Sequence, residues 1–237
     1  KGALARVKAL AQLRSSHLTP VIGLLRGLTD PVVGLSMGQT AEILAHRFNI
    51  SREQMDAFAM ASHQRLAAAQ DQGLLDEIEV VYDREGNCYN SDDGLRRETD
   101  MASLGKLKPV FDKPFGKVTA GNSAQVTDGA AWLILASEDA VQRHKLPVLA
   151  RLVDSEWAGL DPAQMGLGPV HAMAPLFMRH GYDSTDIDYW EINEAFAAQV
   201  LACLAAWQDP DYCRSEFKRD MPFAPIDPAR LNVDGGG

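Results

Sequence analysis

The chain has 237 residues, of which 46% are hydrophobic and 23% are charged, a balance that is typical of folded globular proteins and excludes a mainly disordered chain. This length corresponds to one large domain or two small ones. The 32 acidic residues outnumber the 23 basic ones and give a formal net charge of −9, which argues against general nucleic-acid binding because such a chain repels phosphate backbones.

Signals for targeting and for disulfides are weak. The longest apolar stretch near the start, residues 18–28, contains a proline and an arginine and is shorter than the roughly 20 residues of a membrane span, so we expect no transmembrane helix. Three cysteines without a CxxC pair favour a reducing compartment, and we expect a cytoplasmic protein. The chain begins with Lys1 and ends on three glycines, so we expect a piece of a longer protein.

The first elements in chain order are a basic segment and a helix start. Residues 1–29 hold five basic side chains and no acidic one. Apolar residues such as Leu4 and Val7 recur there at helical spacing, so one interpretation is a solvated amphipathic helix and the other is a surface for an anionic ligand. Residues 36–42 are expected to form a loop that opens a helix, with Met37 as a flexible apolar contact.

A helix over residues 52–72 is the clearest local prediction. Ser51 and Gln54 form a capping-box pattern, apolar residues then recur at helical spacing, and Gly73 ends the pattern. The alternation from Glu77 to Tyr82 predicts a short strand. Residues after this strand, up to 116, are expected to be loop with short helical turns.

Beyond residue 116 the chain is expected to alternate strands with helices. The predicted strands lie at 117–120, 130–136, 147–154 and 187–192. One predicted helix begins at Pro169 and ends at Gly181, and another runs from Asn193 to Trp207. This alternation predicts α/β layers after residue 116.

Two polar segments are candidates for a functional site. Asn193 and Glu194 follow a predicted buried strand, where α/β sheets place their ligands, although a helix N-cap with a first-turn carboxylate is the structural alternative. The small residues Thr119–Ser123 suit close backbone approach by a ligand, and an ordinary strand-to-helix turn is the alternative there.

Taken together and in order, six segments resemble the thiolase family. They are residues 37–42 (MGQTAE), 51–59 (SREQMDAFA), 106–111 (KLKPVF), 119–123 (TAGNS) with 128–131 (DGAA), 193–199 (NEAFAAQ) and 232–236 (NVDGG). The resemblance implies an α/β fold of thiolase-like layered sheets, incomplete in this chain, with a mainly helical and irregular loop domain. It implies that residues 1–116 are the loop domain, 117–145 the end of the N-terminal half, and 146–237 the first part of the C-terminal half.

The resemblance also implies an activity. Thiolases are acyltransferases that move an acyl group between an enzyme cysteine and coenzyme A, by Claisen condensation or by thiolytic cleavage of a 3-ketoacyl-CoA, as in fatty-acid β-oxidation. Coenzyme A or acetyl-CoA is then a substrate, no cofactor is permanently bound, and a homodimer or homotetramer is expected. The histidines show no metal-ligand spacing, so no metal site is expected.

The family's catalytic cysteines and histidine have no counterpart here. Cys88, Cys203 and Cys213 match neither the nucleophilic Cys nor the acid/base Cys of thiolases, and no Gly-His-Pro motif is present. The 237-residue chain alone is therefore expected to be inactive. The alternative is a non-catalytic thiolase-like protein that binds acyl-CoA or lipid, or an assembly subunit.

The resemblance assigns roles to several residues. Asn193 holds the water that completes an oxyanion hole for the thioester oxygen. Arg96 and Ser103 contact the nucleotide and pantetheine of coenzyme A, with Arg97 as the alternative to Arg96 and with a surface ion pair to Asp92 or Asp93 as the alternative role of Arg96.

Further residues are expected around the pantetheine arm and the acyl group. Ala120 offers its backbone to the pantetheine amides, and Met37 and Phe111 line the pantetheine channel. Met165 and Phe196 line the acyl pocket.

Overall fold

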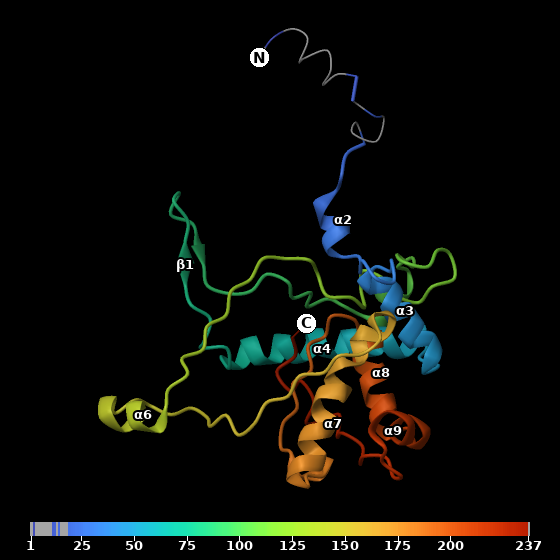
Figure 1. Cartoon of the computed structure of the whole chain (residues 1–237). Coiled ribbons are helices and arrows are strands. Elements are labelled where there is room, and N and C mark those ends of the chain that lie inside the picture. Colours follow the sequence, from blue (N-terminus) through green and yellow to red (C-terminus); the bar gives the residue numbers. More distant parts are fainter. Residues whose placement is uncertain (1, 3–10, 13, 15–18, 237) are drawn as a thin grey trace. The chain divides into compact units, whose positions relative to one another are not determined.

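The computed structural model describes residues 2, 11–12, 14 and 19–236, and these fall into two compact units, Lys1–Met37 and Gly38–Gly237. The helix expected near the start of the chain lies outside the described residues. In the first unit, helix α2 (Gly23–Gly27) is followed by a turn in which the Asp30 carboxylate accepts hydrogen bonds from the backbone N–H groups of Val32 and Val33. Figure 1 shows the elements in chain order.

Two helices open the second unit. Helix α3 (Met37–Arg47) already includes residues 37–42, so the loop expected there is helical, and α4 (Arg52–Gln72) has the predicted bounds. The hydroxyl of Ser51 accepts a 3.1 Å hydrogen bond from the Gln54 backbone N–H, and the Gln54 side chain accepts a 2.7 Å bond from the Ser51 N–H. Gly73 ends α4 at φ 68°, a left-handed conformation that glycine adopts without strain. The capping-box prediction is confirmed.

The second half of this unit is also helical. The 3₁₀ helix η2 (Pro162–Leu167) runs into α7 (Gly168–His180), which Gly181 ends as predicted, and η3 (Ser184–Asp186) follows. Helix α8 (Ala197–Gln208) is followed directly by α9 (Pro210–Phe217). Proline lies in the first turn of both α7 and α9, where its missing N–H costs no helical hydrogen bond.

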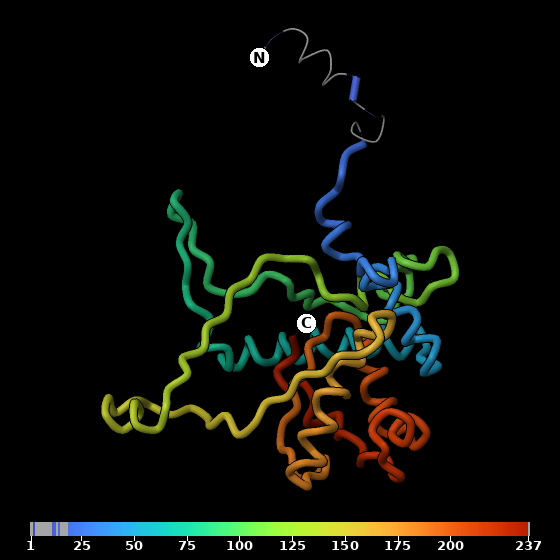
Figure 2. Tube along the Cα trace, viewed as in Figure 1, coloured from blue at the N-terminus to red at the C-terminus, as the bar shows by residue number. Residues whose placement is uncertain are grey.

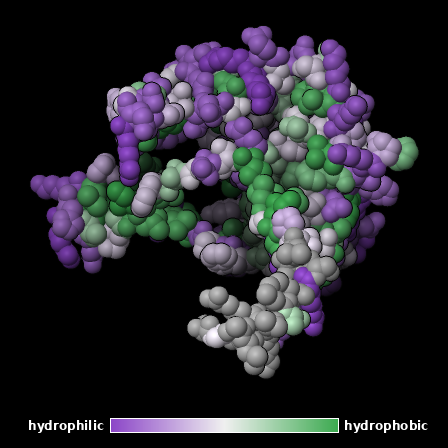
Figure 3. All heavy atoms as spheres, turned by 90° about the horizontal axis from the view of Figure 1, so that it is seen from above, coloured by the Kyte–Doolittle hydropathy of each residue, from purple (hydrophilic) through white to green (hydrophobic). Residues whose placement is uncertain are grey.

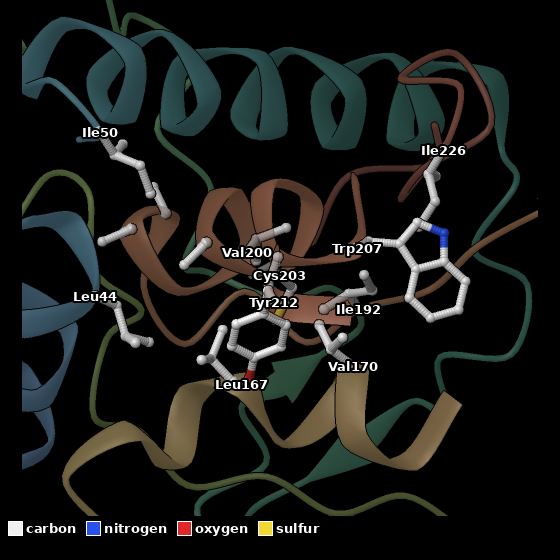
Figure 4. Packing of buried hydrophobic residues seen from close by; sticks show 14 of the residues in the cluster. Leu44, Ile50, Leu167, Val170, Ile192, Val200, Cys203, Trp207, Tyr212 and Ile226 are labelled. Atoms are coloured by element: carbon white, nitrogen blue, oxygen red, sulfur yellow. The ribbon is translucent and has the colours of Figure 1, made fainter. Parts of the chain in front are cut away.

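The hydrophobic core surrounds α8. This helix packs against α4, α7, α9 and η2, and most of its residues are buried. Figure 4 shows side chains of α8 such as Val200 and Cys203 between the ribbon of α4 and residues Leu167 and Val170. Trp207 is fully buried and stacks on Phe223 at 3.8 Å between ring centroids.

The predicted strands after residue 116 do not form in the described part of the chain, which corrects the expectation of layered sheets. The one sheet there is the antiparallel hairpin β1 (Val81–Tyr82) and β2 (Cys88–Tyr89), which places the predicted short strand at its last two residues. Two isolated bridges, Ser123 with Phe196 and Trp190 with Leu231, are what remains of pairing near the predicted strands.

The missing strands have a physical cause. A strand needs a neighbouring backbone to satisfy its N–H and C=O groups, and between residues 130 and 136 no other described segment supplies one. The side chains of Trp132, Leu133, Ile134 and Leu135 are 79–93% exposed. Figure 2 shows the chain here as an extended trace that leads to α6 (Glu138–His144). Sequence reasoning missed α6, although Ser137 before Glu138 and Asp139 is a helix-start signal.

The surface of the molecule mixes both kinds of side chain. Figure 3 shows hydrophobic residues beside hydrophilic ones on the face that it draws. Within the described residues, no helix is both long enough and apolar enough to cross a membrane.

Candidate functional site

Asn193 lies in extended backbone between the bridge residue Trp190 and α8. Its side chain is exposed, whereas its neighbours Ile192 and Glu194 are buried, which is the alternation of an extended chain. The N-cap of α8 is Phe196, and its side chain makes no cap hydrogen bond. Helix α8 thus begins four residues after Asn193, so the helix-cap alternative for Asn193 and the predicted helix start are both wrong.

Glu194 is a buried carboxyl group held by residues distant in sequence. Asn232 donates a 2.6 Å hydrogen bond from Nδ2 to Glu194 Oε1, and the Ser62 hydroxyl of α4 lies 2.5 Å from Glu194 Oε2. Burial raises the pKa of Glu194 above its usual value, and these hydrogen bonds and the charge of Arg65 oppose that shift. The carboxyl group therefore joins α4 to the segment that carries Asn193.

A cavity of about 260 Å³ lies at this segment. It is lined by Glu191, Ile192, Asn193, Glu194, Asn232, Gly235 and Gly236. Gly235 has a φ of 71°, and a Cβ atom there would collide with the α4 backbone at Leu66 and Ser62, so only glycine allows this close approach. The fold thus brings two thiolase-like motifs, residues 193–199 and 232–236, to the same cavity. The sequence had not predicted that Asn232 lies in the candidate site.

The turn at residues 119–123 adjoins the start of α8. Asn122 is buried, its Oδ1 accepts from the Thr119 N–H at 2.8 Å, and its backbone oxygen accepts from the Ala197 N–H at 3.0 Å. Ser123 forms a bridge with Phe196, so the turn does not lead into a helix as the structural alternative supposed. Ala120 remains exposed at the turn.

Two acidic residues of the matched motifs support this turn from inside. Asp56 of α4 accepts a 2.9 Å hydrogen bond from Asn122 and forms a 2.7 Å ion pair with Arg52. Glu42 of α3 accepts hydrogen bonds from the backbone N–H groups of Lys117 and Val118. Both carboxylates therefore hold protein backbone or side chains in place and are not available to a ligand.

Arg96 and Arg97 differ in their surroundings. Arg97 forms a 2.9 Å ion pair with Asp71 and donates a 3.0 Å hydrogen bond to Gln70, both on α4. Within the residues that the structure describes, the guanidinium of Arg96 has no hydrogen bond or ion pair, and its backbone N–H donates to His63 Nδ1 at 3.4 Å. The proposed pairing of Arg96 with Asp92 or Asp93 is therefore not formed.

Ser103 is part of a helix cap. It lies in α5 (Met101–Gly105), where the Asp100 carboxylate accepts a 2.7 Å hydrogen bond from the Ser103 N–H. The Ser103 hydroxyl donates to the Asp100 backbone oxygen at 2.9 Å. The side chain of Ser103 is exposed but is already engaged in this cap.

Of the apolar residues expected around the pantetheine arm and the acyl group, two are in contact with each other. The rings of Phe111 and Phe196 pack edge to face, 6.0 Å between centroids. Met165, on η2, is 38% exposed, and Met37, the last residue of the first unit, is the first residue of α3. Among the described residues, no hydrogen bond or ring contact joins Arg96, Ser103 or Met165 to Asn193. The binding roles assigned to these three residues stay predictions.

Two of the three cysteines, Cys203 and Cys213, are not suited to nucleophilic chemistry. Cys203 is buried, and burial raises the pKa of its thiol to about 12. Burial also raises the pKa of the Cys213 thiol, while Cys88 is exposed on β2. No group of His, Cys, Asp and Glu among the described residues could hold a metal ion.

Comparisons with known proteins agree with one another. Residues 7–139 match the family described as thiolase, N-terminal domain, and residues 146–237 match the one described as thiolase, C-terminal domain. The chain is 41% identical over 214 residues to the mitochondrial 3-ketoacyl-CoA thiolase of Rattus norvegicus. This match covers 89% of this chain and 49% of the rat protein.

Solved structures are similar as well. The human mitochondrial 3-ketoacyl-CoA thiolase in complex with CoA is matched with a TM-score of 0.77 at 38% identity, over 94% of this chain and 54% of that chain. The Bacillus anthracis acetyl-CoA acetyltransferase is matched with a TM-score of 0.79 at 32% identity, over 95% and 53%. The chain thus spans about half the length of these relatives.

Proposed function

The chain belongs to the thiolase family, and we propose from this premise that it supplies the coenzyme A-binding and oxyanion-stabilising part of an acyl-CoA thiolase. The relatives are named as 3-ketoacyl-CoA thiolases and an acetyl-CoA acetyltransferase. The proposed reaction is Claisen condensation or thiolytic cleavage of a 3-ketoacyl-CoA, with coenzyme A as a substrate. A cytoplasmic location and a homodimer or homotetramer also stay predictions.

The observation that carries this proposal is the position of Asn193. Asn193 is exposed and lines the cavity of about 260 Å³, and none of the described residues makes a hydrogen bond with its side chain. Its neighbours Ile192 and Glu194 are buried and are both hydrogen-bonded to Asn232, so the backbone that carries the Asn193 amide is fixed. A fixed amide donor of this kind, directly or through a water, stabilises the negative charge that develops on a thioester oxygen as an enolate forms.

Coenzyme A binding is supported by a separate set of residues. The guanidinium of Arg96 is not engaged by the carboxylates near it, so it can neutralise a phosphate or stack on adenine. The exposed backbone of Ala120 can approach the pantetheine arm, because the turn below it is held by buried side chains. One of the similar structures is described as a complex with CoA.

The thiolate and the general base of the reaction are not assigned to residues of this chain. Condensation requires a base that removes the α-proton of the acetyl thioester and a cysteine thiolate that leaves as the new carbon–carbon bond forms. The raised thiol pKa values of Cys203 and Cys213 make both poor nucleophiles. We therefore expect the 237 residues by themselves not to turn over acetoacetyl-CoA.

The test uses the full-length product of the gene and follows thiolysis of acetoacetyl-CoA and longer 3-ketoacyl-CoAs. Asn193→Ala should lower kcat by about 10²–10³, the usual cost of an oxyanion-hole donor, with little change in melting temperature. Asn90→Ala is the matched control, because Asn90 is also exposed and is not part of the site.

Two outcomes would contradict the proposal. An unchanged kcat in Asn193→Ala would remove the assigned role of Asn193. A folded gene product that binds coenzyme A in calorimetry but cleaves none of the 3-ketoacyl-CoAs would favour the non-catalytic alternative.

A further inference from the structure

Asn232 lies beside the segment that presents Asn193, although the two residues are far apart in the sequence. From the hydrogen bonds between these segments we infer that Asn232 is a positioning residue, which holds the backbone on both sides of Asn193. This inference rests on the function proposed above and deepens it.

The inference starts from a short parallel pairing. The Trp190 N–H donates to the Arg230 oxygen at 2.8 Å, and the Asn232 N–H donates to the Trp190 oxygen at 2.8 Å, so Trp190 is paired with Leu231 as in a parallel ladder. The ladder stops there, because Asn232 has a left-handed φ of 46° and the chain turns away. The backbone of Ile192 is then left without a backbone partner.

The side chain of Asn232 replaces that missing partner. Its Oδ1 accepts a 2.9 Å hydrogen bond from the Ile192 N–H, and its Nδ2 donates a 2.8 Å bond to the Ile192 oxygen. The other hydrogen of Nδ2 is donated to Glu194 Oε1 at 2.6 Å. One buried amide thus forms hydrogen bonds with the backbone of Ile192, before Asn193, and with the side chain of Glu194, after it.

This arrangement sets the direction of Asn193. In an extended chain, successive side chains point to opposite faces, so fixing Ile192 and Glu194 on the inner face turns Asn193 to the outer one. Glu194 is held a second time by Ser62 of α4, and Arg65 of α4 donates a 2.7 Å hydrogen bond to the Leu231 oxygen. The segment and the turn that follows Asn232 are therefore both attached to the same helix.

Only an amide fits this role among side chains of its size. The site uses two donors and one acceptor, which asparagine provides. An aspartate of the same size has no donor when ionised and would place its charge against the carboxyl group of Glu194. Asn232→Asp is thus a substitution that changes the hydrogen bonds and leaves the volume nearly unchanged.

The experiment is a double-mutant cycle in the full-length gene product. Asn232→Asp should lower kcat by about 10- to 100-fold, the range for residues that orient a functional group, and leave the KM for coenzyme A within about twofold. In the Asn193→Ala background, the same change should lower kcat less than about twofold, because it acts through Asn193. A merely structural role would lower kcat equally in both backgrounds.

The matched control is Ser184→Ala. Ser184 is 4% exposed, against 2% for Asn232, and it also joins two segments, since it donates to the Ala224 oxygen at 2.7 Å and accepts from Trp207 Nε1 at 2.9 Å. This change should lower the melting temperature and leave kcat unchanged, because Ser184 does not contact the segment of Asn193.

The outcomes separate this inference from the proposed function. If Asn193→Ala lowers kcat and Asn232→Asp does not, or lowers it equally in both backgrounds, the inference on Asn232 is wrong and the proposed function stands. If Asn193→Ala leaves kcat unchanged, the role of Asn193 itself is wrong. Should Asn232→Asp fail to fold, Ser62→Ala in the same cycle decides, because it keeps Asn232 and removes the contacts of α4 with Glu194 and with the Gly236 oxygen. A loss of kcat that is seen with Asn193 present and is absent in the Asn193→Ala background supports the inference, and any other result overturns it.

Discussion

At the scale of single residues, buried and exposed polar side chains have different tasks in this chain. Asn122, Asp56 and Asn232 are about 2% exposed, and their hydrogen bonds go to other residues of the protein. Asn193 and Arg96 are exposed, and their side chains have no hydrogen bond with a described residue. Because an engaged buried group is not available to a ligand, the binding candidates are the exposed pair.

Arg96 carries the prediction at this scale. Arg96→Ala should raise the KM for coenzyme A several-fold, and more so at low salt, where an exposed charge is least screened. Arg97→Ala is the control, since the Arg97 guanidinium is engaged by Asp71 and Gln70 and its loss should leave KM unchanged. Steady-state kinetics of the full-length gene product at two ionic strengths checks this. An effect of Arg97 instead of Arg96 would transfer the role to Arg97.

At the scale of elements, α4 connects the parts of the candidate site. Asp56 in its second turn holds the turn at Asn122, and Ser62 and Arg65 in its middle hold the segments of Glu194 and Leu231. Sequence periodicity predicted the bounds of α4 but not these contacts, because they depend on which distant segments pack against the helix. The candidate site is therefore built on α4, a helix whose two ends are set by the caps at Ser51 and Gly73.

A second element contact should depend on pH. Asp154 lies in the extended segment before η2 and pairs with His180 at 2.6 Å and Arg179 at 2.8 Å at the end of α7. The hydrogen bonds from His180, the Ser155 N–H and Arg179 lower the pKa of Asp154 to about 2. A lowered carboxyl pKa stabilises the folded protein above its unfolded pKa of 3.8, and this contribution is lost as pH falls from about 4 towards about 2.

The test compares urea midpoints of the wild type and Asp154→Asn at several pH values. The wild type should be slightly more stable at pH 7, since exposed ion pairs contribute little, and the difference should shrink below about pH 4. Asp188→Asn, with its carboxylate 88% exposed and 4.0 Å from Arg230, should show no such change. A difference that grows as the pH falls would contradict the assignment.

At the scale of the whole molecule, the second unit combines a closed helical core with exposed apolar segments. The core around α8 is buried, whereas Trp132, Leu133 and Ile134 are more than 90% exposed. An apolar run of high strand propensity with unpaired backbone is a site for association with other chains. We therefore expect the purified 237-residue chain to associate with itself in a concentration-dependent manner.

A charge in the exposed run should reduce this association. Ile134→Lys should shift the sedimentation-velocity distribution towards monomer and raise solubility, with no loss of melting temperature, because Ile134 is 93% exposed. Met221→Lys is the control, since Met221 is 72% exposed but stands apart from the run, and it should change nothing. A wild-type chain that is monomeric at high micromolar concentration would count against this prediction.

Features that depend on near neighbours in the chain could be predicted from the residues alone. The caps at Ser51 and Gly73, the proline that opens α7 and the glycine that ends it act within one helical turn, and so the bounds of α4 and α7 could be predicted. The order of the motifs was sufficient to predict the family, which the matches to the N- and C-terminal thiolase domains confirm.

The contacts between residues that are distant in the sequence could not be predicted in this way. The strand predicted at 130–136 has suitable residues but no partner, and a strand exists only through its hydrogen bonds to another segment. Asparagine is a common helix cap, yet α8 begins four residues after Asn193. The reason is that Asn232, 38 residues beyond Glu194, holds the backbone from Ile192 to Glu194 extended. Such contacts are set by long-range packing, and no local pattern of residues contains them.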